Sequence, residues 1–316
     1  MIRTAVVGVG YLGRFHAQKY AALEQARLVA IADPNTAARE ALQRELGVEG
    51  VDDYRGLLGR VDAVSIVTPT PSHHAIARFF LDAGVDVLLE KPITVTLEEG
   101  ADLVAAARAG GRILQIGHLE RFNAVIQAVQ PRLTAPRFIE SARLAPFKQR
   151  GTDVDVVLDL MIHDIDLILS IVRSPVISVD AIGSSVFSNE IDIANARLRF
   201  ENGCVANATA SRVSLKTERK LRVFEDDAYL SVDLHQKILT VIRKAEGPVP
   251  EGMPPVSIDE RNFDQGDALN DEIQAFLASV ASREAPLVSG EDGLLALKTA
   301  VDITDQVKKS RERFRR

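Results

Sequence analysis

The first 120 residues alternate short apolar runs with helical patterns, and this alternation constrains the fold more than any other feature of the sequence. Each run is rich in β-branched residues and bounded by Gly, Pro or Asp, as in strands that are buried on both faces of a parallel sheet. Strands are expected at residues 3–7, 28–32, 61–67, 85–89 and 112–116, with helices between them. Repeated strand–helix–strand order predicts an α/β domain with a doubly wound parallel sheet over residues 1–120.

Residues 121–316 follow a different pattern, in which apolar and polar residues alternate and the connections are short. This alternation predicts antiparallel hairpins. Strands are expected at residues 137–144, 176–182, 194–200, 205–211, 220–224, 229–234 and 238–243, and helices at 156–172, 267–282 and 293–313. We therefore expect a second, α+β domain over residues 121–316 with a large open, mainly antiparallel sheet, while the closing helices could pack on either domain. A length of 316 residues agrees with two domains.

The charge balance and the cysteine count exclude several classes of protein. With 38 Lys and Arg against 44 Asp and Glu, the net charge is −6, which argues against a nucleic-acid or anionic-membrane partner. Cys204 is the single cysteine, so the chain has no intramolecular disulfide and no Cys-rich metal site. No apolar run reaches the roughly 18 to 20 residues of a membrane span, and the run at residues 4–8 is too short for a signal sequence. A cytoplasmic protein is expected.

A glycine motif, Gly8-Val9-Gly10-Tyr11-Leu12-Gly13, follows the first expected strand and opens a helix. Gly8 permits a tight turn, Gly10 lets the backbone approach a pyrophosphate, and Gly13 allows close helix–strand packing. Phosphates would lie at the helix N-terminus, beside Tyr11 and Leu12, where unpaired N–H groups favour anions. The motif therefore predicts a dinucleotide site.

Asp33 ends the second expected strand, twenty residues after Gly13. A carboxylate there accepts hydrogen bonds from the adenosine ribose and repels a 2′-phosphate, which favours NAD over NADP. The alternative is a simple turn aspartate before Pro34. Arg39 lies nearby and could weaken this repulsion of NADP. NADP therefore stays open as a second, less favoured cofactor.

Two further strand ends carry polar residues that belong at the same edge of the sheet, where open α/β sheets bind ligands. The first is followed by Thr68-Pro69-Thr70-Pro71-Ser72-His73, and the second by Glu90-Lys91-Pro92. A lysine at a strand end, followed by proline, can extend its ammonium into the cleft. Alternatively, this lysine is solvated at the surface, as most lysines are.

Asp159 and His163 are four residues apart in the helix expected at 156–172, and so lie on one helical face. A neighbouring carboxylate orients an imidazole and raises its pKa, as a general base near neutral pH requires. The alternative is a buried histidine that an aspartate satisfies. A metal site with Asp166 is disfavoured because no further ligand cluster has metal spacing, and no metal is expected.

In this order, the glycine motif, Asp33, the Thr-Pro-x-x-x-His segment, Glu90-Lys91-Pro92 and the Asp-x-x-x-His pair resemble the Gfo/Idh/MocA family of NAD(P)-dependent sugar oxidoreductases. The resemblance implies a Rossmann domain followed by an open-sheet domain, in agreement with the patterns above. It also implies that Lys91 lies in the active site near the nicotinamide. His163 would act on the substrate hydroxyl, with Asp159 beside it.

Two more segments narrow the resemblance. Gly117-His118-Leu119-Glu120-Arg121-Phe122-Asn123 and residues 145–155 are similar to the bacterial UDP-N-acetylglucosamine 3-dehydrogenase branch of that family. The branch oxidises the sugar C3 hydroxyl to a ketone, which an aminotransferase converts into the 3-amino sugar of lipid A. Substrate contacts are then expected from His118, Glu120, Arg121, Asn123, Lys148 and Arg150.

The cations Arg121, Lys148 and Arg150 suit a diphosphate, because Arg binds phosphate bidentately and Lys acts as a point charge. They could equally be surface cations of a loop. Two other functions stay open: a dehydrogenase of a free sugar or inositol, for which these cations are dispensable, and a non-catalytic dinucleotide-binding sensor.

The open sheet also predicts a homodimer or homotetramer. Val205 and Val223 are expected on a face without a cover, and an exposed apolar sheet face usually marks an association surface.

Overall fold

The computed structural model describes residues 1–148, 154–245, 247, 254–263 and 265–314. The chain forms two compact units. The first contains Met1–Phe122 together with Asp267–Leu297, and the second contains Asn123–Gly266 together with Lys298–Arg316. The first unit thus includes a segment from near the end of the chain, where the sequence pattern had left open on which domain the closing helices pack.

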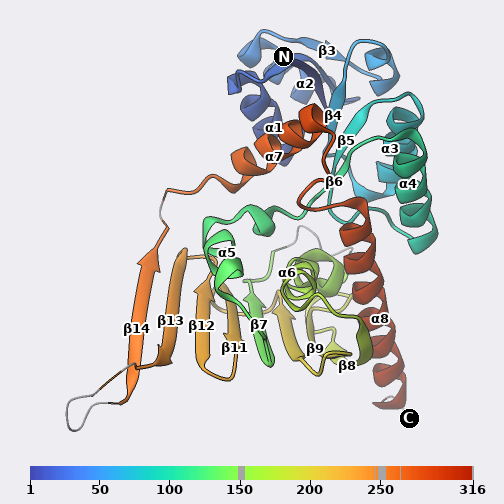
Figure 1. Cartoon of the computed structure of the whole chain (residues 1–316). Coiled ribbons are helices and arrows are strands. Elements are labelled where there is room, and N and C mark those ends of the chain that lie inside the picture. Colours follow the sequence, from blue (N-terminus) through green and yellow to red (C-terminus); the bar gives the residue numbers. More distant parts are fainter. Residues whose placement is uncertain (149–153, 246, 248–253, 264, 315–316) are drawn as a thin grey trace. The chain divides into compact units, whose positions relative to one another are not determined.

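A parallel six-stranded sheet with the order β3-β2-β1-β4-β5-β6 forms the centre of the first unit (Figure 1). The order places β1 inside the sheet and moves outward in both directions, which confirms the predicted doubly wound fold. The short β3 was not predicted, because three residues carry too little pattern to be recognised. The strands are β1 (Ile2–Val7), β2 (Ala26–Ala32), β3 (Glu49–Val51), β4 (Ala63–Ile66), β5 (Asp86–Glu90) and β6 (Leu114–Gly117).

Helices cover both faces of this sheet, with α1, α2 and α7 on one face and α3 and α4 on the other (Figure 1). Their bounds are α1 (Tyr11–Ala22), α2 (Thr36–Leu46), α3 (His73–Asp82), α4 (Leu97–Gly110) and α7 (Ala268–Ser282). The first turns of α8 (Gly290–Phe314) also belong to this unit, as do the short 3-10 helices η1 (Tyr54–Leu57), η2 (Thr70–Ser72) and η3 (Leu119–Phe122).

The core of the first unit joins α1 to α7. Ala17 and Tyr20 of α1 are fully buried against Ile273 and Phe276 of α7, and Val6 of β1 belongs to the same cluster. Burying an aromatic or aliphatic side chain contributes about 1.5–3 kcal/mol. The returning helix α7 is therefore an integral part of the dinucleotide-type fold.

The second unit contains an eight-stranded sheet with the order β14-β13-β12-β11-β7-β10-β9-β8. All neighbours are antiparallel except β7 and β10, as predicted for a mainly antiparallel sheet. The edge strand β14 was not predicted, because its sequence VSIDERN is mostly polar and exposed. The strands are β7 (Phe138–Leu144), β8 (Val176–Ser184), β9 (Ile193–Phe200), β10 (Val205–Ser211), β11 (Glu218–Phe224), β12 (Ala228–Asp233), β13 (Ile238–Lys244) and β14 (Val256–Asn262).

Helices α5 (Ala124–Val129) and α6 (Ile162–Val172) pack on this sheet, and α5 is followed by the 3-10 helix η4 (Gln130–Arg132). Val223 pairs with Ile139 in register, and both side chains are fully buried. The prediction that Val223 lies on an open face is therefore wrong, because it shares the covered face with Ile139. Val205 is half-buried and pairs with Phe138, so it lies on the opposite face.

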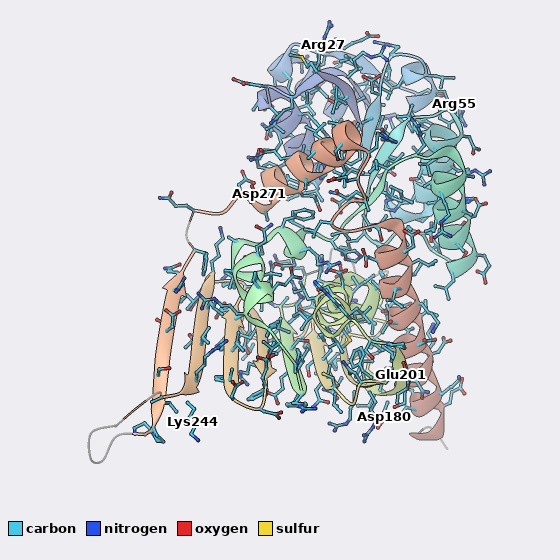
Figure 2. All side chains as sticks on the ribbon, viewed as in Figure 1. Arg27, Arg55, Asp180, Glu201, Lys244 and Asp271 are labelled. Carbon is cyan, nitrogen blue, oxygen red and sulfur yellow. The ribbon has the colours of Figure 1, made fainter. Side chains whose placement is uncertain are left out.

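Charged side chains of both signs cover the two units. Figure 2 labels exposed examples, Arg27 and Arg55 in the first unit and Asp180, Glu201 and Lys244 in the second. Among the described residues, no helix combines the length and apolar character that crossing a membrane would require.

Candidate functional site

The glycine motif forms a tight turn between β1 and α1. Gly8 has φ +86°, in the left-handed region, and a Cβ on it would lie 2.7 Å from the carbonyl oxygen of Val67. A Cβ on Gly13 would lie 1.9 Å from the carbonyl oxygen of Gly8, so neither position accepts a side chain. Gly10 is exposed, caps α1 without a side-chain hydrogen bond, and a Cβ there would meet nothing within 4 Å. The helix N-terminus, with exposed Tyr11 and half-buried Leu12, is thus open to an anionic ligand.

Asp33 is tied to this turn. Its Oδ2 accepts a 2.7 Å hydrogen bond from the backbone N–H of Val9, and its Oδ1 accepts one of 2.7 Å from the N–H of Asn35. Arg39 donates from Nη1 to the carbonyl oxygen of Asp33 at 2.6 Å. The predicted ribose acceptor Asp33 and a guanidinium of the kind that suits a 2′-phosphate are therefore neighbours, and this geometry is compatible with NAD and NADP alike.

His73 joins two loops at the carboxyl edge of the sheet. Its Nδ1 lies 2.8 Å from the carbonyl oxygen of Pro92, and its Nε2 lies 2.8 Å from that of Thr68. Burial lowers the pKa of His73, although the two carbonyls act in the opposite direction. The ring thus connects the segment of Thr68 and exposed Pro69 with the segment that follows Lys91.

Lys91 follows β5 directly and is half-buried, and the peptide bond to Pro92 is cis. The side chain of Glu90 folds back, so that its Oε2 accepts a 3.2 Å hydrogen bond from the backbone N–H of Lys91. Gly117 at the end of β6 leaves space for this carboxylate, because a Cβ there would lie 3.0 Å from it. The lysine backbone is therefore held by the preceding residue.

His118 and Arg121 follow β6 and are both buried. Burial, and then the charges of Lys91 and Arg121, lower the pKa of His118 to about 3, so its ring is neutral near pH 7. Neither ring nitrogen has a hydrogen-bond partner among the described residues. Arg121 Nη2 lies 3.8 Å from Asp292 Oδ2, so Arg121 is not the solvent-exposed cation of the alternative interpretation. Glu120 between them is half-buried.

Asp159 and His163 are half-buried residues of the second unit. The helix predicted over 156–172 is present, but its first part, Val157–Met161 (η5), is a π-helix that leads into α6. Asp155 caps this start, because its Oδ1 accepts from the N–H groups of Val157 and Leu158 at 2.9 and 3.0 Å. Single π turns are frequent at functional sites.

A buried ion pair fixes the residue next to His163. Arg143 of β7 donates to Asp164 from Nε at 2.9 Å and from Nη2 at 3.1 Å. Both side chains are at most 4% exposed. The bidentate pair sets the position of α6 on the sheet and with it the first turn of the helix that carries His163.

The remaining expected substrate contacts lie in the second unit. Asn123 caps α5 by accepting a 3.2 Å hydrogen bond from the N–H of Val125, and it is buried. Lys148 is exposed, and Arg150 lies outside the described residues. Within the first unit, by contrast, Glu90, Lys91, His118 and Arg121 are close enough to influence one another electrostatically.

Sequence patterns did not identify two buried residues beside this group, His16 of α1 and Glu272 of α7. His16 follows the glycine motif at three residues from Gly13, which is a usable signal. Glu272 has no comparable signal, because its partners are far away in the chain.

Comparisons with known proteins agree with this geometry. Residues 2–118 match the family model for the GFO/IDH/MocA oxidoreductases with an NAD-binding Rossmann fold, and residues 115–231 match the C-terminal domain model of the same family. The chain is 41% identical over 303 residues to UDP-N-acetylglucosamine 3-dehydrogenase of Acidithiobacillus ferrooxidans, with 96% of each chain covered.

Two solved structures and a more distant relative also match this chain along nearly its whole length. A structure of the A. ferrooxidans enzyme matches with a TM-score of 0.92 and 39% identity over 98% of both chains. The scyllo-inositol 2-dehydrogenase (NAD(+)) of Bacillus subtilis is 26% identical, over 96% of this chain and 93% of that protein. The Lactobacillus casei scyllo-inositol dehydrogenase with bound NAD(H) has a TM-score of 0.82 at 24% identity, covers 98% of both chains, and shows the fold alone.

Proposed function

Because the chain belongs to the GFO/IDH/MocA family of oxidoreductases, we propose that it oxidises the C3 hydroxyl of UDP-N-acetylglucosamine to a ketone, with NAD as cofactor. The observation that carries this proposal is the 41% identity to a UDP-N-acetylglucosamine 3-dehydrogenase along nearly the whole of both chains. The glycine turn, the strand-end Lys91 and the buried His118 and Arg121 supply residues that suit the reaction.

The cofactor site would be built from Gly8, Gly10, Gly13 and Asp33. The glycine turn fits a pyrophosphate, since Gly8 and Gly13 exclude side chains and Gly10 faces open space. When bound, NAD supplies a hydride acceptor. We favour NAD over NADP because the Asp33 carboxylate would repel a 2′-phosphate and Arg39 is engaged with the Asp33 carbonyl.

Three residues have proposed roles in the chemistry. His163 would take the proton of the C3 hydroxyl, and the bound cofactor would supply the acceptor for the hydride that C3 loses. Asp159 orients His163. The Lys91 ammonium donates a hydrogen bond to the same oxygen and stabilises the negative charge that develops on it.

Substrate recognition is proposed for further residues of both units. Arg121 suits the diphosphate as a bidentate donor, and Lys148 and Arg150 are further cations for it. His118 is neutral and offers a hydrogen bond without charge. Glu120 and Asn123 complete the expected contacts. The 3-keto product would then suit an aminotransferase that forms a 3-amino sugar, as in lipid A synthesis.

A substrate panel tests this function. Purified protein is incubated with UDP-N-acetylglucosamine, other UDP-sugars, free sugars and scyllo-inositol, each with NAD and with NADP, and reduced cofactor is followed by absorbance. We expect NADH with UDP-N-acetylglucosamine and a product lighter by two hydrogen atoms in mass spectrometry. Turnover of inositol alone would favour the activity of the 26% identical relative. No turnover with any compound would favour a sensor.

A homodimer or homotetramer through the sheet of the second unit is also proposed. Phe138, Phe224 and Tyr229 stack across neighbouring strands, with ring centroids 5.6 and 4.9 Å apart, and remain half-buried together with Val205. Such an apolar face favours association. Light scattering at micromolar concentration should give a multiple of 34.4 kDa. A monomeric mass contradicts the proposal.

A further inference from the structure

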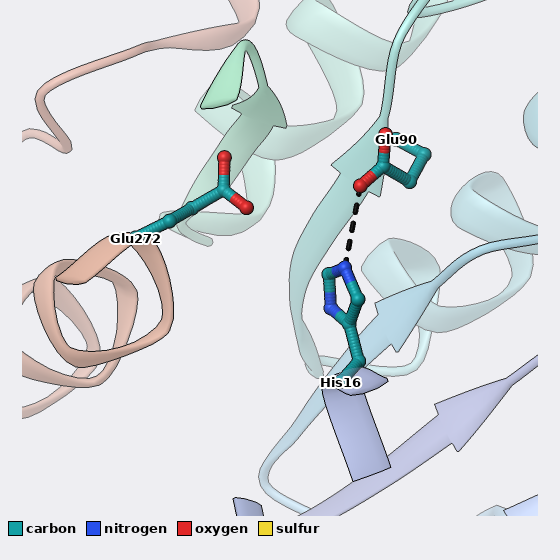
Figure 3. A group of neighbouring side chains, drawn as sticks. All are labelled: His16, Glu90 and Glu272. Carbon is teal, nitrogen blue, oxygen red and sulfur yellow. Dashed lines mark ion pairs between the residues drawn. The ribbon is translucent and has the colours of Figure 1, made fainter. Parts of the chain in front are cut away.

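Three titratable side chains meet inside the first unit: His16 from α1, Glu90 from the end of β5 and Glu272 from α7 (Figure 3). One nitrogen or oxygen of each lies within 4.8 Å of the others. His16 and Glu272 are fully buried, and Glu90 is half-buried. The cofactor and substrate roles proposed above do not use His16 or Glu272.

Glu90 is the central member of this cluster. Its Oε1 lies 3.3 Å from Nε2 of His16, while its Oε2 accepts the backbone N–H of Lys91 at 3.2 Å. One carboxylate thus connects the helix that begins at the glycine turn to the residue proposed to stabilise the substrate oxygen.

Glu272 points toward this pair (Figure 3). Neither of its carboxylate oxygens has a hydrogen-bond partner among the described residues, although its backbone carbonyl accepts a 3.1 Å bond from Gln115 Nε2. Burial, and then the charge of Glu90, raise the pKa of Glu272 well above its usual value. A buried carboxyl group whose pKa is raised takes up a proton more readily than an exposed one, and in its protonated form it can donate a hydrogen bond.

We propose that His16 and Glu272 are positioning residues for Lys91: they hold the Glu90 carboxylate between α1 and α7, and Glu90 in turn holds the backbone of Lys91. The expected change in kcat rests on the proposed function. The expected change in the position of the Lys91 backbone does not. The groups that face Glu272 are His16 and Tyr20 of α1, Gln115 of β6 and Glu90 of β5. His118 and Lys91 add charge or polarity beside Glu90.

The test compares Glu272→Leu with Glu272→Gln. Leucine fills a similar volume without a polar group, and glutamine keeps a hydrogen-bond donor. Asp271→Asn is the matched control, because Asp271 is the neighbouring, partly exposed residue of α7 (Figure 2). Hydrogen exchange of the Lys91 amide, kcat with UDP-N-acetylglucosamine, the Kd of NAD and Tm are measured for each variant.

Glu272→Leu should speed exchange at the Lys91 amide and lower kcat, each by about tenfold or more, because small misplacement of a catalytic group is costly. The Kd of NAD should change by less than about threefold, because Glu272 is not proposed to contact the cofactor, and Tm reports whether the variant keeps its fold. Glu272→Gln should restore kcat to within about threefold of the wild type. Asp271→Asn should behave as wild type.

If the hydrogen-exchange rate of the Lys91 amide in Glu272→Leu is the same as in the wild type, the inference is overturned. So does a stoichiometric metal ion in the purified protein that is lost in this variant, because the cluster would then be a metal site. If the wild type does not oxidise UDP-N-acetylglucosamine, the proposed function fails while the exchange measurement still decides the positioning role. If Glu272→Leu does not fold, His16→Gln replaces it with the same expected exchange result.

Discussion

Arg143 and Asp164 form a bidentate ion pair that is almost completely buried between β7 and α6. Taking two charges out of water is expensive, and here the cost is offset by two parallel charge-assisted hydrogen bonds. Removing one member of the pair therefore destabilises the unit, because the other charge stays buried and loses two strong hydrogen bonds. Its position beside His163 connects the stability of the second unit with the geometry of the proposed general base.

The first prediction concerns this pair. Arg143→Leu should lower the free energy of unfolding by about 3–5 kcal/mol, because the buried Asp164 carboxylate loses both hydrogen bonds from the guanidinium. Arg222→Leu is the control on the same sheet: its 3.4 Å pair with Glu140 is solvent-exposed, and such pairs contribute about 0–1 kcal/mol. Urea unfolding followed by circular dichroism measures both. Equal losses in the two variants would contradict the prediction.

The second prediction concerns the catalytic assignments. His163→Gln should reduce kcat about 10²- to 10⁴-fold, the usual contribution of a general base. Lys91→Met should also abolish most turnover, because the oxygen that becomes negatively charged loses its donor. The Kd of NAD, measured by calorimetry, should stay within about threefold in both. Lys298→Met, at an exposed ion pair with Asp302, is the control and should retain full activity. Near-normal kcat in either test variant would refute its role.

The third prediction concerns cofactor choice. Asp33→Ala should weaken NAD binding about 10- to 100-fold, because a charged acceptor of ribose hydrogen bonds contributes about 1.5–3 kcal/mol. Binding of NADP should weaken less, since the repulsion of the 2′-phosphate disappears. Asp52→Asn, at an exposed position beyond β3, should leave both affinities unchanged. Titration calorimetry with the two cofactors decides the question, and an unaltered NAD affinity in Asp33→Ala would exclude the ribose contact.

The fourth prediction concerns pH. The pKa of His118 is about 3 in the folded protein and about 6.5 when unfolded. Between these values the unfolded chain binds the extra proton, so stability falls as the pH drops below about 6.5. From about pH 7 to pH 4.5 the loss should be on the order of 2–3 kcal/mol for this one group.

His118→Gln removes that loss, so the stability difference between the two pH values should shrink by the same amount. His235→Gln is the control, because His235 is exposed. Urea unfolding at both pH values measures the effect. A pH dependence that is identical in wild type and His118→Gln would show that the imidazole is not held neutral by burial.

The first unit was largely predictable because its signals are local. Each buried strand is a continuous apolar run, and Gly8 and Gly13 occupy positions where the backbone alone decides the residue type. The open sheet was predictable from alternation in the same way. Strand β14 lacks the apolar half of that alternation, and an exposed edge strand does not need it.

The parts that were not predicted depend on distant residues. The sequence predicts an exposed Val223, but the pairing of Val223 with Ile139 places it on the covered face. The π-helix at Val157–Met161 leaves no mark in hydrophobic periodicity. Glu272 meets His16 and Glu90 only because α7 returns to the first unit, and no pattern within α7 specifies that destination.

That return of α7 has a consequence for how the protein is made. A ribosome completes β1 to β6 long before it reaches Ala268–Ser282, yet Ile273 and Phe276 fill the space beside Ala17 and Tyr20. During translation the nascent first unit therefore exposes apolar surface that α7 later buries. Because α7 buries this surface late in synthesis, a chain truncated before α7 does not form a well-packed first unit.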